Sequence, residues 1–115
     1  MLSLVIPAFN EEATVADAVK SAKRVVQENF DEPCEIVVVD DGSSDETAAR
    51  AEDAGARVIR HPHNTGYGQA LKSGILAAQH DTIVISDADG TYPIEELPKL
   101  VEMFNTGFDM VVGAR

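Results

Sequence analysis

Two aspartates, Asp87 and Asp89, stand two residues apart where an apolar run ends, in the stretch ISDADGTYP (85–93). Burial and mutual repulsion both disfavour two carboxylates in one place. In an extended chain, residues two apart face the same side, so both carboxylates would face one point. Carboxylate oxygens suit a hard divalent cation such as Mg²⁺ or Mn²⁺, and a metal site is therefore one interpretation. A solvated turn at Asp89-Gly90 is the other.

A second acidic pair, Asp40 and Asp41, follows a run of β-branched residues. A carboxylate at the end of a buried strand can accept hydrogen bonds from a ribose hydroxyl or from an N–H of a base. The residues that follow also have a purely structural interpretation. Ser43 and Glu46 match a capping box, and Gly42 suits a tight turn.

The stretch HNTGYGQALKSG (63–74) is rich in glycine but matches neither of the common phosphate-binding patterns. Leu71 stands where the dinucleotide motif needs its third glycine, and the P-loop spacing is absent. Gly74 falls inside a predicted helix, where glycine costs about 1 kcal/mol relative to alanine, so we expect it to pack closely on a sheet. His61 and His63 are candidate metal ligands, although loop histidines without a metal are the favoured interpretation.

These motifs interrupt an alternating pattern of short apolar runs and amphipathic segments. Strands are expected at 2–7, 35–40, 56–60, 81–86 and 109–115, and helices at 11–28, 43–55, 68–79 and 94–105. This alternation predicts right-handed βαβ units in an α/β fold, a Rossmann-like three-layer α/β/α arrangement with a mainly parallel sheet of about five strands. Ligands of such sheets bind beyond the carboxyl ends of the strands, and the polar loops of this chain fall there.

The composition excludes some classes of function. The chain has 115 residues, enough for one domain, and a formal net charge of -11. Such a charge argues against binding to nucleic acid or to an anionic membrane surface. The single cysteine, Cys34, can form no intrachain disulfide and is expected to be a packed residue. No apolar run is long enough for a membrane helix and no signal peptide is visible, so a cytoplasmic location is the default expectation.

Five stretches, in this order, resemble family-2 glycosyltransferases, which have the GT-A nucleotide-diphospho-sugar fold. They are LVIPAFNEE, IVVVDDGSSDET, NTGYGQALKSGI, ISDADGTYP and DMVVGAR, and they span nearly the whole chain. The stretch DADGTYP and the glycine run are most similar to enzymes that make dolichyl- or polyprenyl-phosphate sugars. The resemblance implies a nucleoside diphosphate sugar as donor, Mg²⁺ or Mn²⁺ as cofactor, and inverting sugar transfer to an acceptor such as a polyprenyl phosphate.

The resemblance also implies roles for single residues. Those that match the nucleoside-binding positions of the family are Pro7, Ala8, Phe9, Glu11, Asp40 and Asp41. Asp87 and Asp89 match the metal-binding DXD motif, with Asp87 also contacting the nucleotide and Asp89 taking part in catalysis. Arg115 matches an arginine that holds phosphate near the reaction centre. Thr91 stands where a glutamine is common in this branch, which leaves the third metal ligand open.

Catalytic domains of the family continue beyond VVGAR, so the chain resembles their nucleotide-binding half, as a single domain over 1–115. Two alternatives stay open. A catalytically silent nucleotide-binding module would share these sequence features, and a turnover assay would separate it from an enzyme. A phospho-acceptor receiver domain has a similar length, but it places its acidic pair after the first strand, whereas Asp40 and Asp41 follow the second.

The strand predicted at 81–86 raises a question of pairing. If the resemblance holds, this chain lacks the later strands that flank it in whole enzymes. The strand is then either an edge, or the strand at 109–115 takes a place beside it. An apolar edge with unpaired backbone groups is a template for pairing with another chain. We therefore expect a homo-oligomer through this edge, or a rearranged last strand.

We expect Asp89→Asn to weaken binding of a nucleoside diphosphate in Mn²⁺ far more than binding of the uncharged nucleoside. The metal would screen the diphosphate from this acidic chain, whereas a nucleoside needs no such screening. Isothermal titration calorimetry with both ligands measures the difference. Equal affinity of the wild type and the variant for the diphosphate would contradict the metal assignment.

Overall fold

The structure, a computed structural model, describes residues 2–29, 34–79, 82–85 and 110–112. In chain order the elements are β1 (Leu2–Ala8), α1 (Val15–Asn29), β2 (Cys34–Asp40), α2 (Thr47–Asp53), β3 (Arg57–Arg60), α3 (Tyr67–Ala77), β4 (Thr82–Ile85) and β5 (Met110–Val112). All five predicted strands are confirmed, and the helix predicted at 94–105 lies outside the described residues. Within the described ranges, no helix is both long and apolar enough to cross a membrane.

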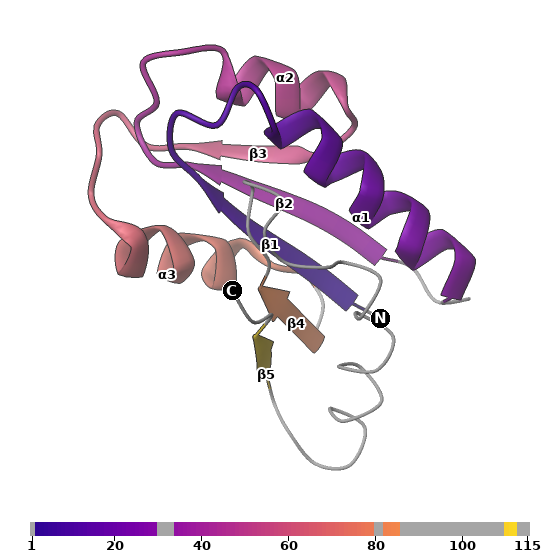
Figure 1. The fold of residues 1–115 in the computed structure, drawn as a ribbon. Helices are drawn as coiled ribbons and strands as arrows, with labels where there is room; N and C mark the ends of the chain where they lie inside the picture. The colour runs from indigo at the N-terminus through magenta and orange to yellow at the C-terminus, as the bar shows by residue number, and fades with distance from the viewer. Residues whose placement is uncertain (1, 30–33, 80–81, 86–109, 113–115) are drawn as a thin grey trace.

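The strands form one sheet in the order β3-β2-β1-β4-β5, and every pairing is parallel. The longest pairing joins β1 to β2, from Leu2 opposite Cys34 to Ala8 opposite Asp40. Figure 1 shows α1 and α2 over one face of the sheet and α3 against the other. The predicted α/β class with a parallel sheet is therefore confirmed.

Alternate side chains of β2 serve the two faces of the sheet. Ile36 and Val38 belong to the core under α1 and α2, whereas Val37 and Val39 belong to the core under α3. Because both faces are covered, each position of the strand favours an apolar residue. This is why the strand has a continuous apolar run in place of an alternating pattern.

Two helices begin later than the sequence predicts. Residues 11–14 form a turn in which the N–H of Val15 donates to the carbonyl of Glu11 at 2.9 Å, and α1 starts only at Val15. The helix α2 starts after Glu46, whose side chain makes no capping hydrogen bond. The predicted capping box of Ser43 and Glu46 is therefore wrong, and the hydroxyl of Ser43 bonds to another loop, as described below.

The strand β4 has a neighbour on each side. It pairs with β1 from Leu2 opposite Thr82 to Val5 opposite Ile85. On its other side, β5 pairs with it from Ile83 opposite Met110 to Ile85 opposite Val112. The last strand thus takes the place beside β4, the second of the two arrangements expected from the sequence. Because β5 covers this edge of β4, the structure gives self-association through it no support.

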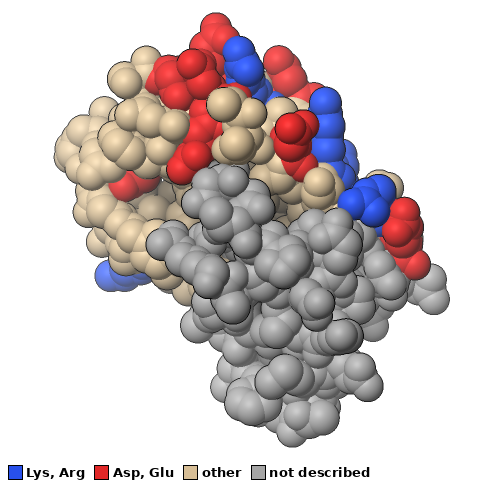
Figure 2. Space-filling view, viewed as in Figure 1, with Lys and Arg blue, Asp and Glu red and all other residues tan. Residues whose placement is uncertain are grey.

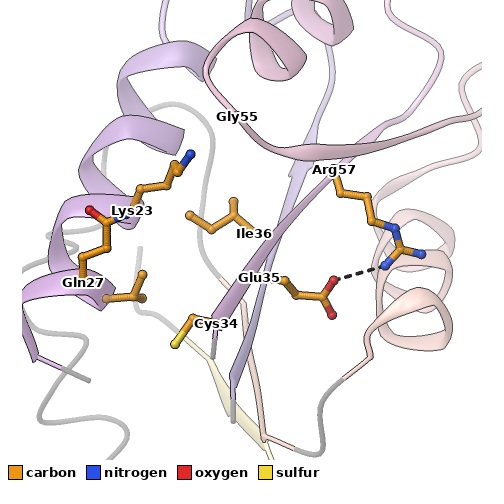
Figure 3. Close-up of a pocket in the computed structure, with 8 residues that line it drawn as sticks. Lys23, Gln27, Cys34, Glu35, Ile36, Gly55 and Arg57 are labelled. Carbon is orange, nitrogen blue, oxygen red and sulfur yellow. Dashed lines mark hydrogen bonds and ion pairs between the residues drawn. The ribbon is translucent and has the colours of Figure 1, made fainter. Parts of the chain in front are cut away.

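At the amino ends of the strands, one carboxylate joins several segments. Glu35 accepts hydrogen bonds from the hydroxyl of Ser3 and from the N–H of Gln79, both at 2.6 Å, and forms an ion pair with Arg57 at 3.1 Å. Burial alone would raise the pKa of Glu35, but these donors and the charge of Arg57 together lower it. Glu35, Arg57 and the half-buried, packed Cys34 line a cavity of about 410 Å³. Figure 3 shows these three side chains.

Gly74 lies where α3 packs on the sheet. A β-carbon added at Gly74 would overlap Cγ1 of Val5 and lie 3.1 Å from Cγ2 of Val39. Glycine therefore lets α3 approach β1 and β2 closely, which outweighs its cost within a helix. The expectation of close packing at this position is confirmed.

We expect Gly74→Ala to destabilise the protein by up to about 2 kcal/mol, because overpacking costs about 1–3 kcal/mol and the gain in helix propensity returns only about 1 kcal/mol. Gly68→Ala is the matched control in the same helix, since nothing lies within 4 Å of the position of its β-carbon. Urea unfolding followed by circular dichroism measures both variants. A Gly74→Ala protein at least as stable as Gly68→Ala would contradict the packing argument.

Candidate functional site

The loops that follow β1, β2 and β3 lie together at the carboxyl edge of the sheet (Figure 1). The N–H of Asp41 donates to the carbonyl of Ala8, and the N–H of His61 donates to the carbonyl of Asp40, both at 2.9 Å. These bonds continue the strand pairings past the strand ends. The three loops therefore lie side by side at the edge of the sheet where ligands are expected to bind.

Asn10 joins the loop after β1 to the loop after β2. Its N–H donates to Oγ of Ser43, and its side-chain Oδ1 accepts from the N–H of Ser44, both at 2.9 Å. Asn10 has a φ of 52°, in the left-handed region that asparagine tolerates better than most residues. The hydroxyl of Ser43 thus holds the first loop and does not cap α2.

Thr47, fully buried at the start of α2, forms a second link between these loops. Its hydroxyl accepts a hydrogen bond from the N–H of Glu11 at 2.9 Å and donates one to Asp45. Asp45 also accepts from the N–H of Glu12 at 3.3 Å. Hydrogen bonds, chiefly the one from Thr47, hold the pKa of the Asp45 carboxyl below its usual value. The chain's own polar groups therefore fix the two loops against each other.

Asp40 ends β2 opposite Ala8 and is 6% exposed. Its Oδ1 accepts a hydrogen bond from the N–H of Ser43 at 3.0 Å. Among the residues that the structure describes, none bonds to its Oδ2. One oxygen of this carboxylate can therefore accept a hydrogen bond at the carboxyl edge.

Asp41 is also buried, but its oxygens are occupied. Oδ1 accepts from the N–H of Thr65 at 3.0 Å, from the hydroxyl of Thr65 at 2.6 Å and from Nδ1 of His61 at 2.8 Å. Oδ2 accepts from the N–H of Gly66 at 2.9 Å. Burial alone would raise the pKa of Asp41, but these hydrogen bonds lower it to about 2. The carboxylate of Asp41 is thus ionised, and within the described part of the chain its donors come from segment 61–66.

The structure brings together one group of the residues proposed from the sequence. Those at the carboxyl ends of β1 and β2 are Pro7, Ala8, Phe9, Glu11, Asp40 and Asp41. Those that lie outside the described residues are Asp87, Asp89, Thr91 and Arg115. Within the part of the chain that the structure describes, no group of three or more His, Cys, Asp or Glu side chains could hold a metal ion. His61 and His63 therefore gain no support as metal ligands.

Sequence reasoning missed the residues that hold these loops in place. Asp45 and Thr47 had a local signal, because an aspartate two residues before a helix start can accept from the backbone N–H there, and Oδ1 of Asp45 accepts from the N–H of Thr47 at 3.0 Å. Ser73 had none, since its partner His61 lies 12 residues away on another segment. Such a partner becomes visible only once the sheet has formed.

Comparison with known proteins settles the family. The sequence model of a protein family, described as Glycosyl transferase family 2, matches residues 3–115 of this chain. The chain belongs to glycosyl transferase family 2. The parallel sheet with helices on both faces is the GT-A fold of this family, as its solved structural neighbours show. The resemblance of the five sequence stretches is thereby confirmed.

Named relatives of this family-2 glycosyltransferase chain include lipid-phosphate sugar transferases. A dolichyl-phosphate hexose transferase of Haloferax volcanii is 38% identical over 114 residues, which are 99% of this chain and 47% of that protein. An undecaprenyl-phosphate 4-deoxy-4-formamido-L-arabinose transferase of Pseudomonas aeruginosa is 37% identical over 121 residues, 100% of this chain and 35% of that protein. The chain thus spans less than half the length of these relatives.

A solved structural neighbour of this family-2 glycosyltransferase chain holds both a metal and a sugar nucleotide. Glucosyl-3-phosphoglycerate synthase from Mycobacterium tuberculosis, in complex with Mn²⁺, UDP-glucose and phosphoglyceric acid, matches with a TM-score of 0.77 and 35% identity. The match covers 93% of this chain and 40% of that one. The same enzyme in complex with Mn²⁺, UDP and glucosyl-3-phosphoglycerate matches with a TM-score of 0.75.

We expect Thr47→Val to lower the free energy of unfolding by about 1–3 kcal/mol, because it leaves the N–H of Glu11 without its acceptor and removes one of the donors to Asp45. Thr47→Ser is the matched control, since it keeps the hydroxyl and removes one methyl group. Denaturant unfolding measures both. If the valine variant proved as stable as the serine variant, the hydroxyl would not be the link between the loops.

Proposed function

We propose that this chain binds the nucleoside diphosphate sugar donor of a glycosyltransferase at the carboxyl edge of its sheet. The observation that carries the proposal is Asp40, which is buried at the end of β2 with one oxygen fixed by Ser43 and the other able to accept. Such an acceptor suits a base N–H or a ribose hydroxyl. Phe9 follows Ala8, the residue opposite Asp40, and its 45% exposure offers an apolar surface for a base or ribose.

The comparisons support the classes of donor and acceptor. The glucosyl-3-phosphoglycerate synthase neighbour is in complex with UDP-glucose, and two relatives are named for dolichyl phosphate and undecaprenyl phosphate. For the whole protein we propose inverting transfer of a sugar to a polyprenyl phosphate at the cytoplasmic face of a membrane. A phosphate acceptor is already ionised, so its oxygen can attack the anomeric carbon without a general base, whereas a hydroxyl acceptor would need one.

The proposal includes a divalent cation, Mg²⁺ or Mn²⁺. Asp87 and Asp89 would hold it, because two carboxylates supply the oxygen ligands that these ions prefer. When bound, the cation neutralises charge that develops on the departing diphosphate. The net charge of -11 favours this arrangement. Figure 2 shows Asp and Glu side chains, with Lys and Arg among them, over the upper part of the molecule, where Figure 1 places α2. Arg115 would contact phosphate.

A nucleotide-binding module without transfer activity is the second candidate. It needs only groups that bind the nucleoside, and Asp40 and Phe9 at the carboxyl edge are such groups. A turnover assay with UDP-glucose and a polyprenyl phosphate separates the candidates. Transfer above the rate without protein supports the enzyme, and nucleotide binding without transfer supports the module.

We expect Asp40→Ala to weaken binding of uridine and of UDP by about tenfold or more, since it removes a hydrogen bond to a charged group. The loss should be the same in EDTA and in Mn²⁺, because Asp40 would contact the nucleoside and not the metal. Asp53→Ala, which removes an exposed carboxylate from α2, is the control for the change in charge. Calorimetry measures both. A loss seen only when metal is present would contradict this role.

A further inference from the structure

His61 connects three segments of the carboxyl edge. It follows β3, its Nδ1 lies 2.8 Å from Oδ1 of Asp41 after β2, and its Nε2 lies 2.8 Å from Oγ of Ser73 on α3. The side chain of His61 is 13% exposed. A ring bonded at both nitrogens has one fixed orientation and a defined tautomer.

The partners of His61 decide where its protons lie. Burial acts to raise the pKa of Asp41, but hydrogen bonds lower it to about 2, so at neutral pH this carboxylate can only accept. Nδ1 of a neutral His61 ring must therefore carry the proton, and Nε2 then accepts from the hydroxyl of Ser73. A protonated ring would donate from both nitrogens to the same two partners. The arrangement is thus satisfied in both states.

Segment 61–66 packs tightly on the residues that follow β2. The N–H groups of Thr65 and Gly66 donate to Asp41 at 3.0 Å and 2.9 Å. Gly42 lies so close to the segment that a β-carbon added there would overlap the segment's backbone. The position of this segment therefore depends on where the carboxylate of Asp41 is held.

We propose that His61 is a positioning residue that holds segment 61–66 beside the proposed nucleoside pocket through its hydrogen bond to Asp41, while Ser73 orients the ring. In this arrangement Asp41 orients the segment, and Asp40 contacts the ligand. The assignment of the pocket to a nucleotide rests on the proposed function, whereas the positioning of the segment does not.

Two substitutions at His61 separate its two hydrogen bonds. His61→Asn places an amide nitrogen where Nδ1 stands and keeps a donor to Asp41, whereas His61→Gln reaches toward Ser73 and loses that donor. His63→Asn is the matched control, because His63 is exposed and makes no hydrogen bond with the described residues. We expect the amides of segment 61–66 that bond to Asp41 to exchange with solvent about tenfold faster in His61→Gln, and near the wild-type rate in the other two variants.

Equal exchange rates in the wild type and His61→Gln would overturn the proposal. Equal acceleration in His61→Asn and His61→Gln would also overturn it, because the bond to Asp41 would then not be what holds the segment. In nitrogen–proton correlation spectra of the wild type, recorded at a pH where the His61 ring is neutral, the ring proton should lie on Nδ1. A neutral ring protonated at Nε2 would contradict the geometry on which the proposal stands.

Calorimetry with UDP and Mn²⁺ tests the link between the segment and the ligand. We expect His61→Gln to bind UDP about tenfold more weakly than the wild type, with His61→Asn and His63→Asn close to the wild type. If the wild type binds no UDP, the proposed function fails, and the exchange rates still decide whether His61 positions the segment. If exchange rises in His61→Gln while its UDP affinity equals that of the wild type, the segment does not shape the pocket and the proposal is overturned.

Discussion

The buried carboxylate of Asp41 must keep its hydrogen-bond donors, and the carboxyl edge of the sheet is arranged around that requirement. The residue is 4% exposed, and removing the partners of a buried charge costs several kcal/mol. Its donors lie in segment 61–66, and its own N–H bonds to Ala8 at the end of β1. The parallel pairing of β2 with β1 and β3 brings these segments together, and the charge then keeps them in one arrangement.

The strands and the fold class could be predicted from the sequence because a parallel strand covered on both faces is apolar at nearly every position. The apolar run through Val37 and Val39 is an example. Close packing could be predicted at Gly74 because a glycine inside a helix lowers its stability, and close approach to a sheet is the reason that compensates. Asp87 and Asp89 stay predictions, since they lie outside the described residues.

The loop contacts could not be predicted in the same way. Ser43 had a local partner in the expected capping box, but it bonds to Asn10, 33 residues earlier in the chain. His61 likewise pairs with Asp41, 20 residues away, and nothing in its neighbouring sequence indicates that partner. Local patterns indicate which groups can form hydrogen bonds, while the sheet decides which groups meet.

A fall in pH lowers the stability that one carboxylate contributes at each edge of the sheet. Hydrogen bonds outweigh burial and lower the pKa of both Glu35 at the amino edge and Asp41 at the carboxyl edge, to about 2 for Asp41. The stability that each adds is complete above its unfolded-state pKa, about 4, and is lost as the pH falls through its folded-state pKa. Acidification therefore weakens the hydrogen bonds that join neighbouring segments through Glu35 at one edge and through Asp41 at the other.

The link through Asn10 also limits how this protein can diverge. Ser43 and Ser44 both bond to Asn10, so an insertion or deletion in either loop would break the contacts of the other. Change of loop length, a common route to new binding specificity, is therefore constrained here. Under the proposed function, donor preference would diverge instead by exchange of exposed side chains such as Phe9 in these loops. An engineer who wished to graft a new pocket would have to transplant both loops as one unit.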